Sequence, residues 1–263
     1  MFNFTIIKME LKRAWKGLLV WTLAIGITLF LIIILYPMVK DIYALIPAEL
    51  QSIMESFGGI PDTVLEYFAT EGAMMMQIFA SIFAVMLGFN SITKEEREHS
   101  SDAVFSLPVS RSEFFWNKLY AAMIQVLAFS VGLFIFNVIG FLAVEPRVNI
   151  TDFVWFSLLF TLMLMMMDIL GMALGAALRG NVKNMVSLLI PFPLYIIALI
   201  SQLTNNEWLK KLKYLTIFTF SDPIVLLKGG AQIEYVNMII YGTLSILALI
   251  YAHNRFKNRE FLI

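Results

Sequence analysis

The segment DFVWFSLLFTLMLMMMDILGMALGAAL, residues 152–178, decides the fold. It holds only two charged side chains, Asp152 at its start and Asp168, and a run of about 18 or more apolar residues is long enough to cross a bilayer as a helix. The chain contains five comparable runs, so the predicted spans are residues 17–39, 73–92, 119–144, 152–178, 185–203 and 237–254. The sequence therefore predicts an all-α integral membrane protein with six transmembrane helices.

The composition supports the same class. Hydrophobic residues make up 60% of the 263 residues and charged residues 14%, whereas a soluble domain carries roughly 25% charged residues. Six spans occupy more than half of the chain, so we expect residues 1–263 to form one transmembrane domain with no room among them for a soluble catalytic domain. Cysteine is absent, which excludes disulfides, thiolate metal sites and a cysteine nucleophile.

The basic residues set the orientation of the spans. Thirteen of the nineteen Lys and Arg lie in the amino-terminal segment, the loop 93–118, the loop 179–184 and the carboxyl-terminal tail. Cytoplasmic loops carry the excess of basic residues, so both termini are expected in the cytoplasm. The loops 40–72 and 204–236 then face outward, and the protein is expected to be a multi-pass protein of a plasma membrane.

The segment before the first span is amphipathic. Lys8, Lys12 and Lys16 recur on one helical face, and apolar side chains, Phe4 and Ile7 among them, occupy the other. Residues 2–16 are therefore predicted to form an elbow helix on the inner membrane surface, with its basic face toward lipid headgroups. The pattern fits a simple membrane anchor, and it also fits an elbow that moves during a transport cycle.

The loop 93–118 has the form of a helical hairpin end. A charged helical stretch comes first, Pro108 breaks the helix, and Ser110 and Glu113 have the spacing of a capping box that opens the third helix. The charged stretch could be a solvated face. Because apolar residues such as Phe105 and Leu107 follow it with nothing in the chain to pack against, we expect a cytoplasmic partner.

The string KEEREHSSDAVFSLPVSRSEFFWNK, residues 94–118, resembles the signature loop of type-2 ATP-binding cassette transporter permeases, the drug, antibiotic and peptide exporter class. The chain departs from the usual wording where Ser100 and Ser101 replace a Gly-Thr pair. The matching residues are Glu95, Glu96, Arg97, Glu98, Leu107, Pro108, Val109, Ser110, Arg111 and Lys118.

The resemblance implies a function and a set of partners. The loop would hold the coupling helix that docks on a cytoplasmic ATPase subunit, through Glu95, Glu96, Arg97, Glu98, Phe105, Leu107, Pro108 and Arg111. The chain has no G-x-x-x-x-G-K-[ST] phosphate loop, so ATP and Mg are expected on a separate ATPase. A second permease subunit, identical or homologous, would complete an export pathway for a hydrophobic or amphipathic drug, antibiotic or peptide in a bacterial membrane. No catalytic residue, metal site or nucleic-acid partner is expected.

Asp168 is the one acid well inside a predicted span. Such acids face the bundle interior or a cavity, so Asp168 is expected in helix packing and hydrogen bonding or in substrate contact. Gly171 and Gly175 form a G-x-x-x-G pattern on the same helix face, which permits close approach of a second helix.

Two other function classes compete with the permease. An ion- or proton-coupled secondary transporter would use Asp168 as its ion site. An intramembrane metalloprotease is disfavoured, because His99 and His253, the only histidines, lie at span ends instead of inside the bilayer.

Three further sequence features lead to structural predictions. Pro191 and Pro193 remove backbone donors, so the fifth span should bend or break there. A short outer helix is expected over residues 46–57. Residues 214–227 are too short and too interrupted to span, and are predicted to form a re-entrant or interfacial segment.

Overall fold

A computed structural model of the chain describes residues 3–43, 45, 59–98, 109–178, 182–204, 206–227 and 233–258. Within these residues all regular structure is helical. Six helical segments are long and apolar enough to cross a membrane: Phe4–Ile34, Val64–Arg97, Arg111–Val144, Thr151–Ala177, Asn184–Gln202 and Tyr235–Lys257. The predicted all-α fold with six spans is confirmed.

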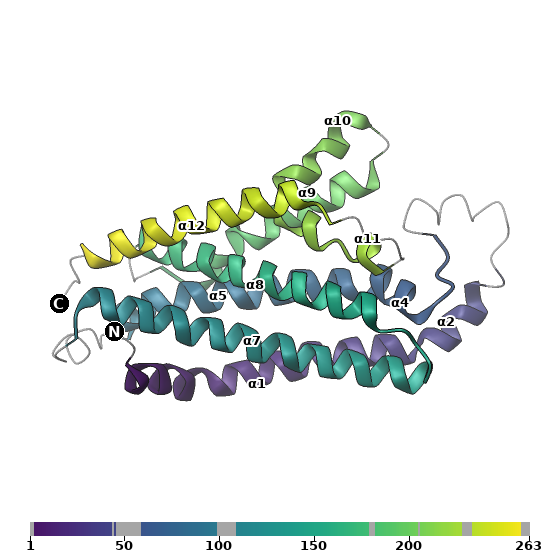
Figure 1. Ribbon diagram of the computed structural model, residues 1–263, viewed down its shortest axis with the longest axis horizontal. Coiled ribbons are helices and arrows are strands. Elements are labelled where there is room, and N and C mark those ends of the chain that lie inside the picture. Colours follow the sequence, from purple (N-terminus) through teal and green to yellow (C-terminus); the bar gives the residue numbers. More distant parts are fainter. Residues whose placement is uncertain are drawn as a thin grey trace.

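The long helices run side by side along the long axis of the molecule (Figure 1). Helix α1 packs on α7, while α5 and α12 both pack on α8. Helices α1 and α7 begin, and α5, α8 and α12 end, at the same end of the bundle, which we call the terminus-bearing end (Figure 1). The helix bounds are α1 Phe4–Ile34, α5 Ala73–Arg97, α7 Arg111–Val144, α8 Thr151–Ala177 and α12 Tyr235–Lys257.

Helices α5 and α8 meet along a seam of glycines. A side-chain carbon added at Gly88 of α5 would collide with the backbone carbonyl of Asp168, and one added at Gly171 of α8 would collide with the carbonyl of Val85. Gly175 also faces the α5 backbone, where an added carbon would lie 2.9 Å from a carbonyl oxygen. The two backbones therefore touch directly, the kind of contact that small residues allow between membrane helices.

The expected elbow helix over residues 2–16 is not separated from the first span. Helix α1 is unbroken from Phe4 to Ile34, because Gly17 is the only weak helix former near the expected boundary and no proline interrupts the run. Ile6 and Ile7 are buried, and Ile6 packs with the start of α7 and the end of α12. The segment is thus the first part of a bundle helix. A second short helix, α2 Tyr36–Tyr43, follows α1.

The second span is longer than the expected range 73–92. It begins with α4 Val64–Tyr67 and a π-helical turn, η1 Phe68–Gly72, and continues as α5. The Thr63 side chain caps α4 by accepting a hydrogen bond from the Glu66 backbone N–H at 3.2 Å. At the other end, the charged residues Glu95 to Arg97 form the last turn of α5, so they are not on a separate helix.

The capping box predicted at the start of the third helix is confirmed, and α7 begins at Arg111, earlier than the predicted span of residues 119–144. Ser110 is the N-cap of α7, and its hydroxyl accepts a hydrogen bond from the Glu113 backbone N–H at 3.2 Å. The following aromatic residues divide between two environments: Phe114 and Phe115 are buried against Phe256 of α12, while Trp116 is exposed. Phe114 and Phe115 therefore pack α7 against α12, whereas Trp116 faces outward.

The fifth span breaks at its prolines, as predicted. A 3₁₀ helix, η2 Asn184–Leu189, ends just before α9 Pro191–Leu203 begins. At the end of the bundle opposite the termini follow α10 Glu207–Lys210, η3 Lys211–Leu215, η4 Ile217–Ser221 and α11 Pro223–Leu227. Helices η4 and α11 form the short apolar segment expected over 214–227, and both pack against α8. The helix expected over 46–57 lies outside the described residues.

Candidate functional site

A buried group of charges joins three helices at the terminus-bearing end. The Lys118 ammonium of α7 donates hydrogen bonds to both carboxylate oxygens of Glu95 of α5, each at 2.6 Å, and another to the Ser91 backbone carbonyl. Glu10 of α1 lies 3.9 Å from the same ammonium. The Lys118 and Glu95 side chains are 0% and 3% exposed. We call Glu10, Ser91, Glu95 and Lys118 the Lys118 cluster.

The local sequence explains why these charges meet. The Ser110 cap fixes where α7 begins, so Lys118 falls two turns into the helix on the side that faces α5. Glu95 lies in the last turn of α5. Since a buried ion pair is tolerated only with close geometry and further hydrogen bonds, the bidentate contact and the Ser91 carbonyl account for its survival here. The ion pair therefore joins α5 and α7 near the ends that are consecutive in the sequence.

Of the other residues predicted to couple to the ATPase, some contact neighbouring side chains of this chain and others lie on the surface. The Arg97 guanidinium donates to the side-chain oxygens of Asn90, at 3.1 Å, and of Asn184, which begins η2. Glu96 is half-buried, whereas Glu98 is exposed. Arg111 is also exposed, and Phe105, Leu107 and Pro108 lie outside the described residues. Arg97 therefore connects the end of α5 to the fifth span.

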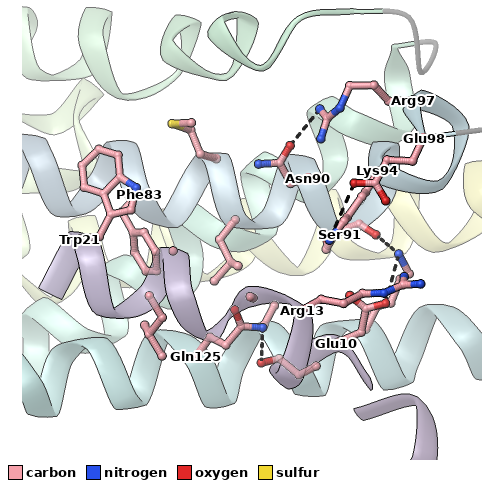
Figure 2. A pocket seen from close by; sticks show the side chains of 18 residues that line it. Glu10, Arg13, Trp21, Phe83, Asn90, Ser91, Lys94, Arg97, Glu98 and Gln125 are labelled. Atoms are coloured by element: carbon pink, nitrogen blue, oxygen red, sulfur yellow. Dashed lines mark hydrogen bonds and ion pairs between the residues drawn. The ribbon is translucent and has the colours of Figure 1, made fainter. Parts of the chain in front are cut away.

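A cavity of about 350 Å³ opens beside the Lys118 cluster, between α1, α5 and α7 (Figure 2). Its lining includes Glu10, Arg13, Asn90 and Gln125, none of which the sequence analysis singled out. One signal was available for Glu10, because it follows Ile6 and Ile7 at helical spacing on the apolar face of α1. An acid in that register indicates a buried partner.

Asp168 lies deep in the bundle. Its side chain is 0% exposed, and neither carboxylate oxygen has a hydrogen-bond partner among the described residues. Its backbone carbonyl faces Gly88 in the α5–α8 seam, and Asp168 does not line the cavity of Figure 2. Gly171 and Gly175 lie in the same seam. The structure thus places all three residues where α8 meets α5.

The histidine that the structure describes is engaged at the terminus-bearing end. The His253 Nε2 and the Ser112 hydroxyl lie 2.7 Å apart, and the imidazole packs between Phe115 and Trp116. Among the described residues no three His, Cys, Asp or Glu side chains are grouped in a way that could hold a metal ion. His99 is outside this part of the chain.

Six helical segments that are long and apolar enough to cross a membrane indicate a multi-pass membrane protein. Comparison with known protein families matches residues 4–260 to the ABC-2 family transporter protein family, so the chain belongs to that family. It is the membrane permease component of an ABC-2 type transporter, in which the ATPase is a separate subunit, and membership implies association with such subunits. A search of curated proteins found no match.

Proposed function

We propose that the chain is the permease subunit of an exporter that moves a hydrophobic or amphipathic substrate, such as a drug, antibiotic or peptide. Two permease subunits, identical or homologous, would form the pathway, and two cytoplasmic ATPase subunits carrying ATP and Mg would drive it. The observation that carries the proposal is the Lys118 cluster, which locks three span ends together beside the segment expected to dock on the ATPase.

The cluster supplies a physical route for coupling. A displacement of the segment between α5 and α7 acts on both helices at once, because the 2.6 Å contacts of Lys118 with Glu95 hold their ends together. Glu10 extends the effect to α1. Opposite charges excluded from water attract more strongly than exposed ones. The three span ends would therefore move as one unit when the ATPase subunits close.

The predicted coupling residues take different roles in this mechanism. Glu98 and Arg111 are exposed and suited to touch the ATPase directly, together with the apolar residues Phe105 and Leu107. Glu95 is enclosed, so its role is to hold the segment in position. Arg97 would pass the movement to η2 and the fifth span through Asn184.

The orientation of the bundle in the membrane is inferred from the distribution of its basic residues. Basic residues concentrate at the terminus-bearing end, so this end would face the cytoplasm under the positive-inside rule, and the plasma membrane of a bacterium is the proposed location. The short helices η4 and α11 would then lie at the outer side, near the exit of the pathway.

The test is co-purification with a candidate ATPase. The full chain is expressed in membranes with the ATPase, solubilised gently, and assayed for a stable complex and for vanadate-sensitive ATP hydrolysis. The double variant Glu96→Lys, Glu98→Lys should insert normally but lose at least about tenfold in ATPase affinity, since like-charge contacts at an interface cost several kcal/mol. The variant Glu207→Lys, on α10 at the opposite end, is the matched control. Unchanged ATPase binding in the double variant would remove the docking assignment.

A secondary transporter driven through Asp168 has weaker support. Its carboxylate is enclosed where α8 packs against α5, and it does not line the cavity between α1, α5 and α7. An ion-coupled carrier needs an acid that exchanges with solution. Transport that persists in membranes lacking every ATPase partner would restore this alternative.

A further inference from the structure

We propose that the groove between α1 and α5 binds a membrane aminophospholipid: the ammonium group would contact Gln125 and Glu10, the phosphate would lie near Arg13 and Lys94, and an acyl chain would follow the apolar part of the groove. The inference goes beyond the export function, because it concerns binding by the permease alone. It requires no ATPase and no transported substrate.

The groove is built from two cavities that share Trp21. Trp21 lines both the cavity of about 350 Å³ at the terminus-bearing end and a second cavity of about 200 Å³, and its ring centroid lies 6.0 Å from that of Phe83. The second cavity is lined by Trp21, Ala24, Ile25, Thr28, Leu29, Met75 and Phe79. We call the two together the α1–α5 groove.

Polarity changes along the α1–α5 groove. Figure 2 shows Arg13, Lys94, Arg97 and the acids gathered at one end, with Trp21 and Phe83 at the other. Beyond Trp21 the lining is almost wholly apolar, and its Met75 and Phe79 are about half exposed. A groove that is charged at one end, apolar at the other and open between two spans matches an amphiphile that enters from the bilayer.

The packing of α1 explains why the groove stays open. Helix α1 fits closely on α7: an added carbon at Gly26 would collide with the Phe136 ring, and one at Gly132 of α7 would collide with Thr22. Its contact with α5 is far smaller. Because α7 fixes α1 in place, α1 cannot close onto α5 without breaking that contact, and the space between them remains.

Two buried acceptor oxygens in the groove have no hydrogen bond among the described residues. The Gln125 side chain is 4% exposed; its Nε2 donates to the Ala121 carbonyl at 3.2 Å, but its Oε1 has no hydrogen-bond partner among the described residues. The Glu10 side chain is 8% exposed, and its Oε1 likewise has no hydrogen bond. This oxygen lies 3.9 Å from the Lys118 ammonium, which already bonds both carboxylate oxygens of Glu95. Both line the groove. Buried acceptors without donors are costly, so they indicate a ligand that brings N–H groups, and a carboxylate favours a charged donor.

The mouth of the groove offers the complementary charge. Arg13 of α1 is exposed there, and Lys94 of α5 forms a long, partly exposed ion pair with Glu98, at 4.0 Å. These cations suit an anionic group next to the ammonium. A primary ammonium, a phosphate and an apolar chain occur together in an aminophospholipid. Phosphatidylcholine lacks the N–H donor, and phosphatidylglycerol lacks the ammonium.

The experiment compares these three lipids on the full-length protein. Purified protein in detergent is titrated with phosphatidylethanolamine, phosphatidylcholine and phosphatidylglycerol of identical acyl chains, and bound lipid is counted by native mass spectrometry. Phosphatidylethanolamine should bind about tenfold more tightly than phosphatidylcholine, the effect of one hydrogen bond to a charged group. Free phosphoethanolamine should compete poorly, since it lacks the chain. Equal binding of the two zwitterionic lipids would overturn the proposal.

Matched variants separate the two halves of the groove. Gln125→Leu should reduce phosphatidylethanolamine binding to the level of phosphatidylcholine and leave the latter unchanged, while Gln125→Glu, which keeps the acceptor, should retain it. Ala24→Trp should fill the apolar half and weaken all three lipids together. Gln202→Leu on α9 controls for loss of an amide elsewhere. Undiminished preference for the ammonium in a folded Gln125→Leu protein, judged by its melting temperature, would refute the assignment.

Discussion

The two ends of the bundle are held together by different interactions. At the terminus-bearing end Lys118 and Glu95 form a buried ion pair between α7 and α5. At the opposite end neutral side chains bond to backbone carbonyls of the short helices: Gln77 Nε2 donates to the Ser221 carbonyl at 2.7 Å, and the Tyr241 hydroxyl to a carbonyl of η3 at 2.6 Å. The terminus-bearing end therefore contains a buried ion pair, whereas the Lys213–Glu234 ion pair of the opposite end, at 2.8 Å, is partly exposed and the buried contacts there are neutral hydrogen bonds.

This difference has mechanical consequences. A neutral hydrogen bond contributes about 1 kcal/mol, so the loss of one at the opposite end leaves the others in place. Removing one partner of a buried ion pair leaves a charge without compensation and costs about 3–5 kcal/mol. The terminus-bearing end is thus built to stay assembled as one unit, as the proposed coupling requires. The opposite end can rearrange one contact at a time.

The largest loss of stability is expected from a substitution in the seam between α5 and α8, because these two helices run between the two ends of the bundle. Gly88→Val would drive a side chain into the backbone carbonyl of Asp168, which cannot move as a flexible side chain can. We expect this variant to yield no folded, monodisperse protein in detergent. Samples heated to a series of temperatures and then run on size-exclusion chromatography give the melting temperature of each variant. Gly17→Val is the control, because nothing lies within 4 Å of an added carbon there. Similar melting temperatures for the two variants would show that the seam is not rigid.

A smaller effect, confined to the terminus-bearing end, is expected from Lys118→Met. The Glu95 carboxylate would remain buried without its partner, so stability should fall by about 3 kcal/mol. Adding Glu95→Gln removes the uncompensated charge and should restore at least about half of the loss. Thermal unfolding of the single and double variants measures the loss of stability and its recovery. If the second change deepens the loss instead, the ion pair is not what holds this end.

The sequence was sufficient to predict the six spans, because long apolar runs report burial in lipid directly. It placed the start of the second span too late. Glu66 and Glu71 made residues 64–72 look like a polar loop, yet Val64 and Phe68 in that stretch are buried among other helices. A helix buried by protein instead of lipid leaves a weaker hydropathy signal, and the π-turn of η1 has no residue signature of its own.

The site was predicted only in part, for a related reason. The family signature drew attention to Glu95 as a residue that contacts the ATPase, but nothing in the sequence predicted its burial. Its burial depends on Lys118, which lies 23 positions further on and on another helix. Periodicity within one helix cannot reveal a partner on the next. Gln125 gave no signal at all, since a single amide in an apolar span is compatible with packing, hydrogen bonding or ligand contact.

The smallest effect is expected at the opposite end, from Asp222→Asn. Burial raises the pKa of the Asp222 carboxyl, although the backbone N–H groups of Val225 and Ile224 act in the opposite direction. The folded state therefore binds this proton more tightly than the unfolded state, so the stability that Asp222 contributes is complete below its ordinary pKa of 3.8 and is lost as the pH rises through the raised value.

Asparagine keeps the acceptor that receives the Ile224 N–H at 2.9 Å but cannot ionise. The variant should match the parent protein at about pH 3 and exceed it slightly at about pH 7, by less than about 1 kcal/mol, in paired thermal unfolding curves. Asp152→Asn reports the unspecific effect of removing one acid. A change several times larger would mean that the opposite end also depends on charge, and the contrast between the two ends would then lie in their geometry alone.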